Sequence, residues 1–204
     1  EFAYQQEIMA QFLEDGAGVF RRVREVATAE WQDAPVEGHN YVFGIDWAIS
    51  KDYTVVSVYD VTERALVHID RFNQIDYNIQ TERVKTLAAR FKPWIVVAES
   101  NAMGLPIIHR LIKDGLPIRA FNTTAGTKDA IIRNLSTAIE RGEVRLPGYE
   151  VLLTELMSYQ VLRVNQNGMP VYGAPEGMHD DCVMSAAIGY VGVGRASTSA
   201  GVVG

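Results

Sequence analysis

Three strand-like runs in direct succession, followed by alternating helices and strands, constrain the fold of this chain most strongly. Residues 41–47, 53–59 and 65–72 are rich in β-branched and aromatic residues, and the short link between the last two predicts a hairpin. A helical pattern over 84–91 then precedes the apolar run 94–98, which is typical of a strand buried on both faces. The pattern predicts an α/β fold. We expect a mixed sheet of three antiparallel strands and then parallel strands, with helices on both faces.

The rest of the chain continues this alternation. Helices are expected near residues 105–113, 131–139 and 151–156, a further strand over 117–121, and a last helix from His179 to about Tyr190. Asn78 is a plausible N-cap for the helix that ends before Pro93. Asn167-Gly168 lies between two extended runs and predicts a β-hairpin with a two-residue turn.

The chain divides into three expected regions. Residues 1–37 are helical in pattern and then irregular, residues 38–194 form the folded domain, and residues 195–204 are a loose tail. The chain begins inside a helical pattern without a methionine, so we expect it to be a fragment of a longer protein.

Composition excludes several classes of protein. No segment reaches the roughly 18 consecutive apolar residues that a membrane-spanning helix needs. A single cysteine, Cys182, excludes an internal disulfide and a multi-cysteine zinc site. The net charge of −6 has the wrong sign for a domain that holds nucleic acid by phosphate neutralisation alone. No glycine-rich phosphate loop ends in Gly-Lys-Ser or Gly-Lys-Thr, so we expect no ATPase activity from this chain.

Four carboxylates carry the functional signal. Asp46 lies within an apolar strand, Glu99 follows the apolar run 94–98, and Asp180 and Asp181 open the last helix. Each has an ordinary structural explanation. Asp46 could be hydrogen-bonded to backbone at a strand end, Glu99 could be the first solvated residue after a strand, and Asp180 could be an N-cap.

Taken together, these four residues predict a metal site at one edge of the sheet. Clustered carboxylates repel one another, and hard divalent cations relieve that repulsion. Ligation by oxygen without His or Cys favours Mg²⁺ or Mn²⁺ over zinc. Two such ions activate water for phosphodiester hydrolysis, and they attract phosphate despite the acidic composition.

In sequence order, four segments resemble the ribonuclease H-like nuclease domain of the large terminase subunits of tailed bacteriophages. They are Gly-Ile-Asp-Trp at 44–47, Lys-Asp-Tyr-Thr at 51–54, Val-Val-Ala-Glu at 96–99 and His-Asp-Asp at 179–181. The stretch 127–147 is similar to the helix and strand that precede the hairpin in that family. The resemblance covers about residues 40–192, and residues 1–37 look similar to the end of the linker after the ATPase motor domain.

The resemblance implies a metal-dependent endonuclease that cuts concatemeric viral DNA when packaging starts and ends. It implies two divalent cations, with Asp46, Glu99, Asp180 and Asp181 as ligands, Asp46 bridging both ions and Asp181 as its preferred partner. Double-stranded DNA, the small terminase subunit, the portal protein and an upstream ATPase domain of the same protein are the implied partners. The implied location is the cytoplasm of the host cell, without a membrane.

Other residues near these motifs carry a weaker signal. Lys51 and Lys128 could contact DNA phosphate, although solvated lysines are the more ordinary interpretation. Asp52 could cap a turn, and His179 could orient water or the aspartates or simply be a polar residue at the start of a helix.

Three alternative functions stay open at this point. A cellular resolvase of the same fold would cut four-way DNA junctions with the same carboxylates. A kinase or ATPase of the actin and hexokinase type also carries an Asp on its first strand, but it needs a duplicated domain. A docking module for a portal or motor would need no buried acids.

Overall fold

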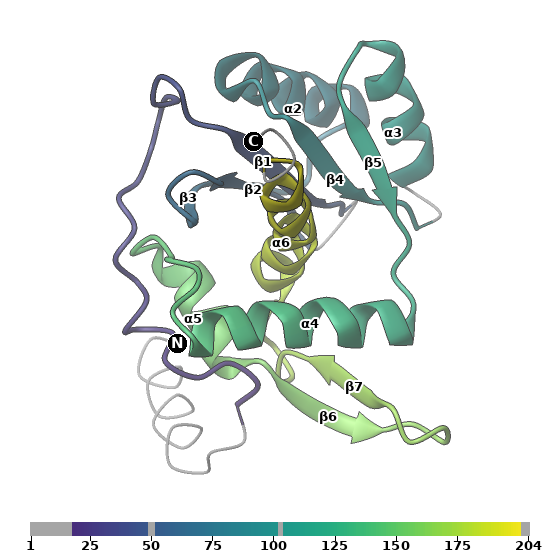
Figure 1. The fold of residues 1–204 in the computed structure, drawn as a ribbon. Coiled ribbons are helices and arrows are strands. Elements are labelled where there is room, and N and C mark those ends of the chain that lie inside the picture. The colour runs from purple at the N-terminus through teal and green to yellow at the C-terminus, as the bar shows by residue number, and fades with distance from the viewer. Residues whose placement is uncertain (1–17, 49–51, 102–103, 201–204) are drawn as a thin grey trace.

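A five-stranded mixed sheet forms the centre of the computed structural model, which describes residues 18–48, 52–101 and 104–200 (Figure 1). Its strand order is β3-β2-β1-β4-β5. β1 pairs antiparallel with β2, and β2 with β3, whereas β4 is parallel to both β1 and β5. The predicted mixed sheet is therefore confirmed. The strands are β1 (Tyr41–Asp46), β2 (Thr54–Asp60), β3 (Ala65–Phe72), β4 (Ile95–Glu99) and β5 (Ile118–Phe121).

Helices cover both faces of this sheet, as Figure 1 shows. Helices α2 (Tyr77–Phe91) and α3 (Gly104–Lys113) pack on one face. Helices α4 (Ala125–Glu140), α5 (Glu150–Ser158) and α6 (Asp181–Ala200) lie on the other, with α6 directly against the central strands. Alternation along β1 explains this arrangement, because Val42 joins the core on the α6 face while Phe43 and Ile45 join the core on the α2 face.

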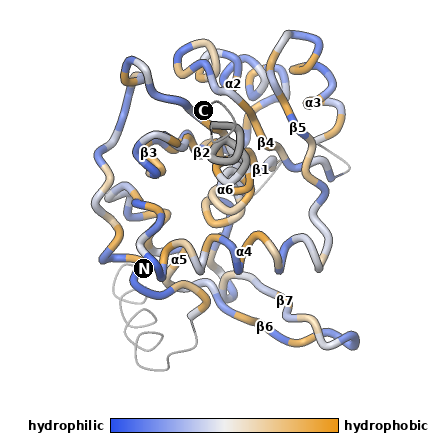
Figure 2. Tube along the Cα trace, in the orientation of Figure 1, coloured by the Kyte–Doolittle hydropathy of each residue, from blue (hydrophilic) through white to orange (hydrophobic). Residues whose placement is uncertain are grey.

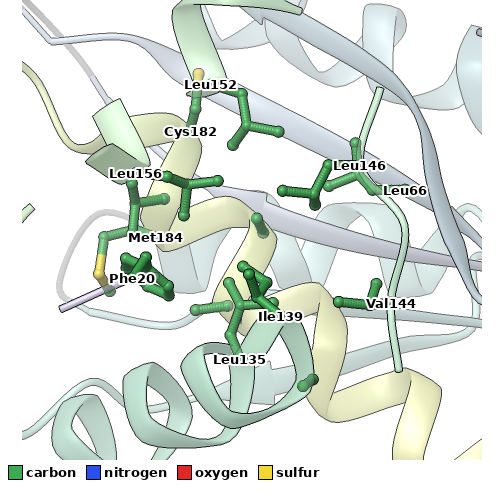
Figure 3. Close-up of a cluster of buried hydrophobic side chains, with 14 of the residues drawn as sticks. Phe20, Leu66, Leu135, Ile139, Val144, Leu146, Leu152, Leu156, Cys182 and Met184 are labelled. Atoms are coloured by element: carbon green, nitrogen blue, oxygen red, sulfur yellow. The ribbon is translucent and has the colours of Figure 1, made fainter. Parts of the chain in front are cut away.

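The larger core lies between the sheet and helices α4, α5 and α6 (Figure 3). Leu135 and Ile139 of α4, Leu152 and Leu156 of α5, and Met184 of α6 meet there. Helix α6 approaches β1 unusually closely at Gly44. A Cβ atom built on Gly44 would lie 2.3 Å from the Gly189 nitrogen and 2.3 Å from the Ser185 carbonyl oxygen. Only glycine permits this contact between a strand and a helix.

A two-stranded hairpin of β6 (Gln160–Val164) and β7 (Pro170–Gly173) extends beyond α4 (Figure 1). Figure 2 shows that its tip is hydrophilic. The predicted two-residue turn is wrong. The connection spans residues 165–169, because the Asn165 side chain accepts the N–H groups of Asn167 and Met169. Gly168 has φ of +75°, which favours glycine.

Three further details differ from the sequence-based expectations. The N-cap of α2 is Asp76, whose carboxylate accepts the N–H of Asn78, so the assignment of Asn78 as the cap is wrong. Residues 143–147 make isolated bridges instead of the strand that the family pattern suggests, with Arg145 beside Ala65. Helix α6 continues past Tyr190 to Ala200, so residues 195–200 are helical.

The segment 18–37 packs against the domain. Phe20, Val23 and Val26 are buried in the larger core, and Val19 N–H donates to the Tyr159 carbonyl. Gln32 N–H donates to a carbonyl of the edge strand β3, and Leu66 N–H of β3 donates to the Arg145 carbonyl. These two hydrogen bonds occupy backbone groups at the start of β3, so this part of the sheet edge is not open to pairing with other chains. In the described ranges, no helix is long and apolar enough to cross a bilayer. The apolar periodicity before residue 18 lies outside the described residues.

Candidate active site

Asp46 and Glu99 are neighbours because their strands are adjacent and parallel. Ile45 of β1 is in register with Ala98 of β4, so the next residue of each strand, Asp46 and Glu99, ends it at the same edge of the sheet. The carboxyl edge of parallel strands is where open α/β sheets bind ligands. Asn101 Nδ2 donates to Glu99 Oε1 at 3.0 Å and holds that side chain at the edge.

Helix α6 brings Asp180 and Asp181 to the same edge. One turn into the helix, Ser185 Oγ lies 2.9 Å from the Gly44 carbonyl oxygen and 2.8 Å from Ser57 Oγ. This buried contact fixes α6 across β1 and β2. Asp181 is the first residue of α6 and only 8% exposed, and its Oδ2 accepts the Tyr53 N–H at 3.2 Å.

The electrostatics of Asp46 reflect the other three acids around it. Burial raises the pKa of Asp46 well above its usual range. Repulsion from Glu99 and a hydrogen bond shared with it raise that pKa further, and the charges of Asp181 and Asp180 act in the same direction. Burial also raises the pKa of Asp181, although the Tyr53 N–H opposes the shift. The site therefore holds more negative charge than the protein alone stabilises.

The basic and polar residues singled out from the sequence have different positions. Lys128 of α4 lies with its Nζ 3.6 Å from Asp180 Oδ2 and 5.8 Å from the centre of the Tyr159 ring, so it borders the acidic cluster. His179 Nδ1 is 3.5 Å from Asp181 Oδ2 and 3.7 Å from the exposed Asp52 carboxylate. Lys51 lies outside the described residues.

The chemistry of the donor set suits a hard cation. The four residues offer only carboxylate oxygens, the ligands that Mg²⁺ and Mn²⁺ prefer. In the ranges that the structure describes, no three or more Asp, Glu, His or Cys side chains are arranged to ligate a single ion as they stand. Ion binding therefore requires carboxylates of this cluster to turn toward one another.

The sequence did not point to Glu155, a buried carboxylate behind the site. Its Oε2 accepts the Cys182 N–H at 2.8 Å and lies 3.4 Å from the Val183 nitrogen, at the start of α6. Burial raises its pKa to about 7. One signal was available: Glu155 lies between Leu152 and Leu156, on the buried face of α5.

Comparisons with known proteins agree with this fold. A family model described as a terminase RNaseH-like domain matches residues 43–190. The large terminase subunits of Thermus virus P23-45 and Thermus phage G20c are each 28% identical to this chain over 207 residues. The match covers 93% of this chain but 41% of each relative, so this chain spans less than half of their length.

Solved structures give the same result. The large terminase nuclease of thermophilic phage G20c with bound magnesium is similar with a TM-score of 0.78 at 27% identity, covering 86% of this chain and 97% of that structure. The large terminase nuclease domain of Thermus phage P74-26 has a TM-score of 0.74, also at 27% identity, covering 85% of this chain and 94% of that one. Since the family model matches most of the sequence, including the strands and the helix that carry the four acids, the chain belongs to the family of terminase RNaseH-like domains.

Proposed function

We propose that this chain is the nuclease part of a large terminase subunit and that it cuts concatemeric double-stranded DNA at the start and end of genome packaging. The observation that carries the proposal is the meeting of Asp46, Glu99, Asp180 and Asp181 at the carboxyl edge of β1 and β4, with a raised Asp46 pKa. The G20c nuclease has been crystallised with bound magnesium, cobalt and zinc, which supports a divalent-metal requirement here.

Each acid has a proposed role that follows from its position. Asp46 is the acid on which Glu99, Asp180 and Asp181 all act electrostatically, so it is the residue suited to bridge two ions. Glu99 and Asp181 would each ligate one of the two ions. Asp180 would serve as a further ligand or would orient another ligand. When bound, two Mg²⁺ or Mn²⁺ ions lower the pKa of water and neutralise charge at the cleaved phosphodiester.

DNA contact must be local because the chain has a net charge of −6. Lys128 borders the acidic cluster and is one candidate for a phosphate contact, and Lys51 is a second, weaker candidate. The remaining grip on DNA would come from the parts of the terminase outside this chain. These are the ATPase domain of the same protein, the small subunit and the portal, all working in the host cytoplasm.

A plasmid assay tests the proposed function. The purified domain with Mn²⁺ or Mg²⁺ should nick and linearise supercoiled plasmid, and EDTA should stop the reaction. Asp46→Asn should abolish cutting, whereas Glu37→Gln removes an equal charge from an exposed residue and should leave it unchanged. Full cutting by Asp46→Asn would refute the proposed chemistry. Preference for a four-way junction over linear duplex would favour a resolvase instead.

A further inference from the structure

Glu155 of α5 is a buried carboxylate that contacts the first turn of α6. It is 4% exposed, and its Oε2 accepts the Cys182 N–H at 2.8 Å, with the Val183 N–H at 3.4 Å. The first N–H groups of a helix have no partner within that helix and carry its partial positive charge. Glu155 therefore caps α6 from a different helix, directly behind Asp181.

Arg71 of β3 connects Glu155 to the other side of Asp181. Its Nη2 lies 3.9 Å from Glu155 Oε1, and its guanidinium carbon lies 3.2 Å from the centre of the Tyr53 ring. Tyr53 in turn donates its backbone N–H to Asp181 Oδ2. Glu155, Arg71 and Tyr53 thus form a continuous set of contacts around Asp181. Glu155 caps the helix that Asp181 begins, and the Tyr53 N–H binds the Asp181 carboxylate.

Because Glu155 caps α6, the carboxylates of Asp180 and Asp181 are available for metal ligation. In an ordinary helix, a residue such as Asp180 would use its own carboxylate to cap the first turn. Here, Glu155 accepts those N–H groups, and Asp180 Oδ2 lies 3.6 Å from Lys128 Nζ instead. Glu155 Oε1, by contrast, is buried without a hydrogen bond in the part of the chain that the structure describes, and Arg71 Nη2 lies 3.9 Å from it. A buried carboxylate oxygen without a hydrogen bond is costly for stability, so packing alone does not account for Glu155.

We propose that Glu155, held by Arg71, is a positioning residue that fixes the first turn of α6 and so the orientation of Asp181 for divalent-metal binding. The inference rests on the proposed function of the site. The proposal concerns how the metal ligands are oriented in the absence of DNA. It can therefore be tested by measuring metal binding to the DNA-free domain.

The test is Mn²⁺ titration of the DNA-free domain by calorimetry, alongside thermal unfolding. Glu155→Ala should weaken Mn²⁺ binding by about 10- to 100-fold, the usual effect of removing a residue that orients ligands. Cleavage should recover at high Mn²⁺ because all the ligands are still present. Glu155→Gln keeps an acceptor oxygen for the helix N–H groups and should restore most of the affinity.

Asp76→Ala is the matched control, because it removes the capping carboxylate of α2. It should lower the unfolding temperature and leave the Mn²⁺ affinity within about twofold of wild type. Wild-type affinity in Glu155→Ala, or an equal loss in Asp76→Ala, would overturn the proposal. If Glu155→Ala does not fold, the proposal stands only if Arg71→Met, which leaves Glu155 in place, weakens Mn²⁺ binding while Asp76→Ala does not. A wild-type domain that binds no Mn²⁺ would overturn the proposed function itself, and this inference with it.

Discussion

Substituting Gly44 by alanine tests how the packing of α6 on β1 controls both stability and the site. The new Cβ would lie 2.3 Å from the Gly189 nitrogen and from the Ser185 carbonyl oxygen, whereas ordinary contacts begin at 3.4 Å. The clashing atoms belong to helix backbone, so no side chain can turn away. The helix must move outward by about 1 Å, which breaks close packing along its contact with the sheet.

Two effects should follow from this movement. Overpacking costs roughly 1–3 kcal/mol when side chains can adjust, so we expect a loss of at least about 3 kcal/mol in the free energy of unfolding. Asp181 moves with α6, and a displacement of about 1 Å in a catalytic group costs up to roughly 100-fold in rate. Plasmid cleavage should therefore fall well beyond the loss expected from the unfolded fraction.

Urea unfolding and cleavage assays on the same samples check both effects. Gly126→Ala is the control, because its Cβ would meet only the Met169 methyl group at 3.9 Å and alanine favours a helix. That variant should be as stable as wild type or more so, with unchanged cleavage. A Gly44→Ala domain with wild-type stability and activity would show that α6 and β1 are not in the close contact described.

Three further perturbations have definite expected outcomes. Asp46→Asn should raise the metal-free unfolding temperature, because it removes a buried charge repelled by Glu99, and should abolish the increase that Mn²⁺ gives wild type; calorimetric scans with and without EDTA measure both. Tyr172→Phe removes a 2.6 Å hydrogen bond to Asp129, which lowers the pKa of Asp129 and connects the hairpin to α4. The variant should lose about 1 kcal/mol in the free energy of unfolding by urea, and an unchanged unfolding midpoint would contradict the contact. Burial lowers the pKa of His68 in the folded protein. As the pH falls below about 6.5, the unfolded chain therefore binds a proton before the folded protein does, and stability is lost. His68→Gln should show a smaller drop in unfolding temperature between pH 7.5 and 5.5 than wild type.

The order of strands was predictable because local sequence decides it. Residues 41–72 read as three strands from their β-branched and aromatic content alone, and the apolar run 94–98 indicated a strand covered on both faces. The N-cap of α2 was missed because Asp76 and Asn78 both have side chains that can cap, and only the backbone conformation separates them. The hairpin loop was missed because Asn165 closes it through hydrogen bonds that the Asn-Gly signal does not contain.

The common location of the four acids was predictable for a different reason. The four acids interrupt apolar or helical patterns, and each lies at a strand end or at a helix start, positions that topology brings to one edge. Glu155 and Arg71 were not predictable, because their partners lie far along the chain and depend on how α5 and β3 pack around α6. The orientations of the carboxylates also depend on local rotamers, which no sequence pattern specifies.

The buried side chains of Phe20, Val23 and Val26 determine where the stably folded domain must begin. Full burial of one such side chain is worth roughly 1.5–3 kcal/mol, so the three together contribute about 5–9 kcal/mol. Natural domains are stable by only about 5–15 kcal/mol in total. A protein shortened to begin at Gly38 would lack these three core side chains and would lose most or all of its stability. A domain prepared for study therefore needs its N-terminus upstream of Phe20.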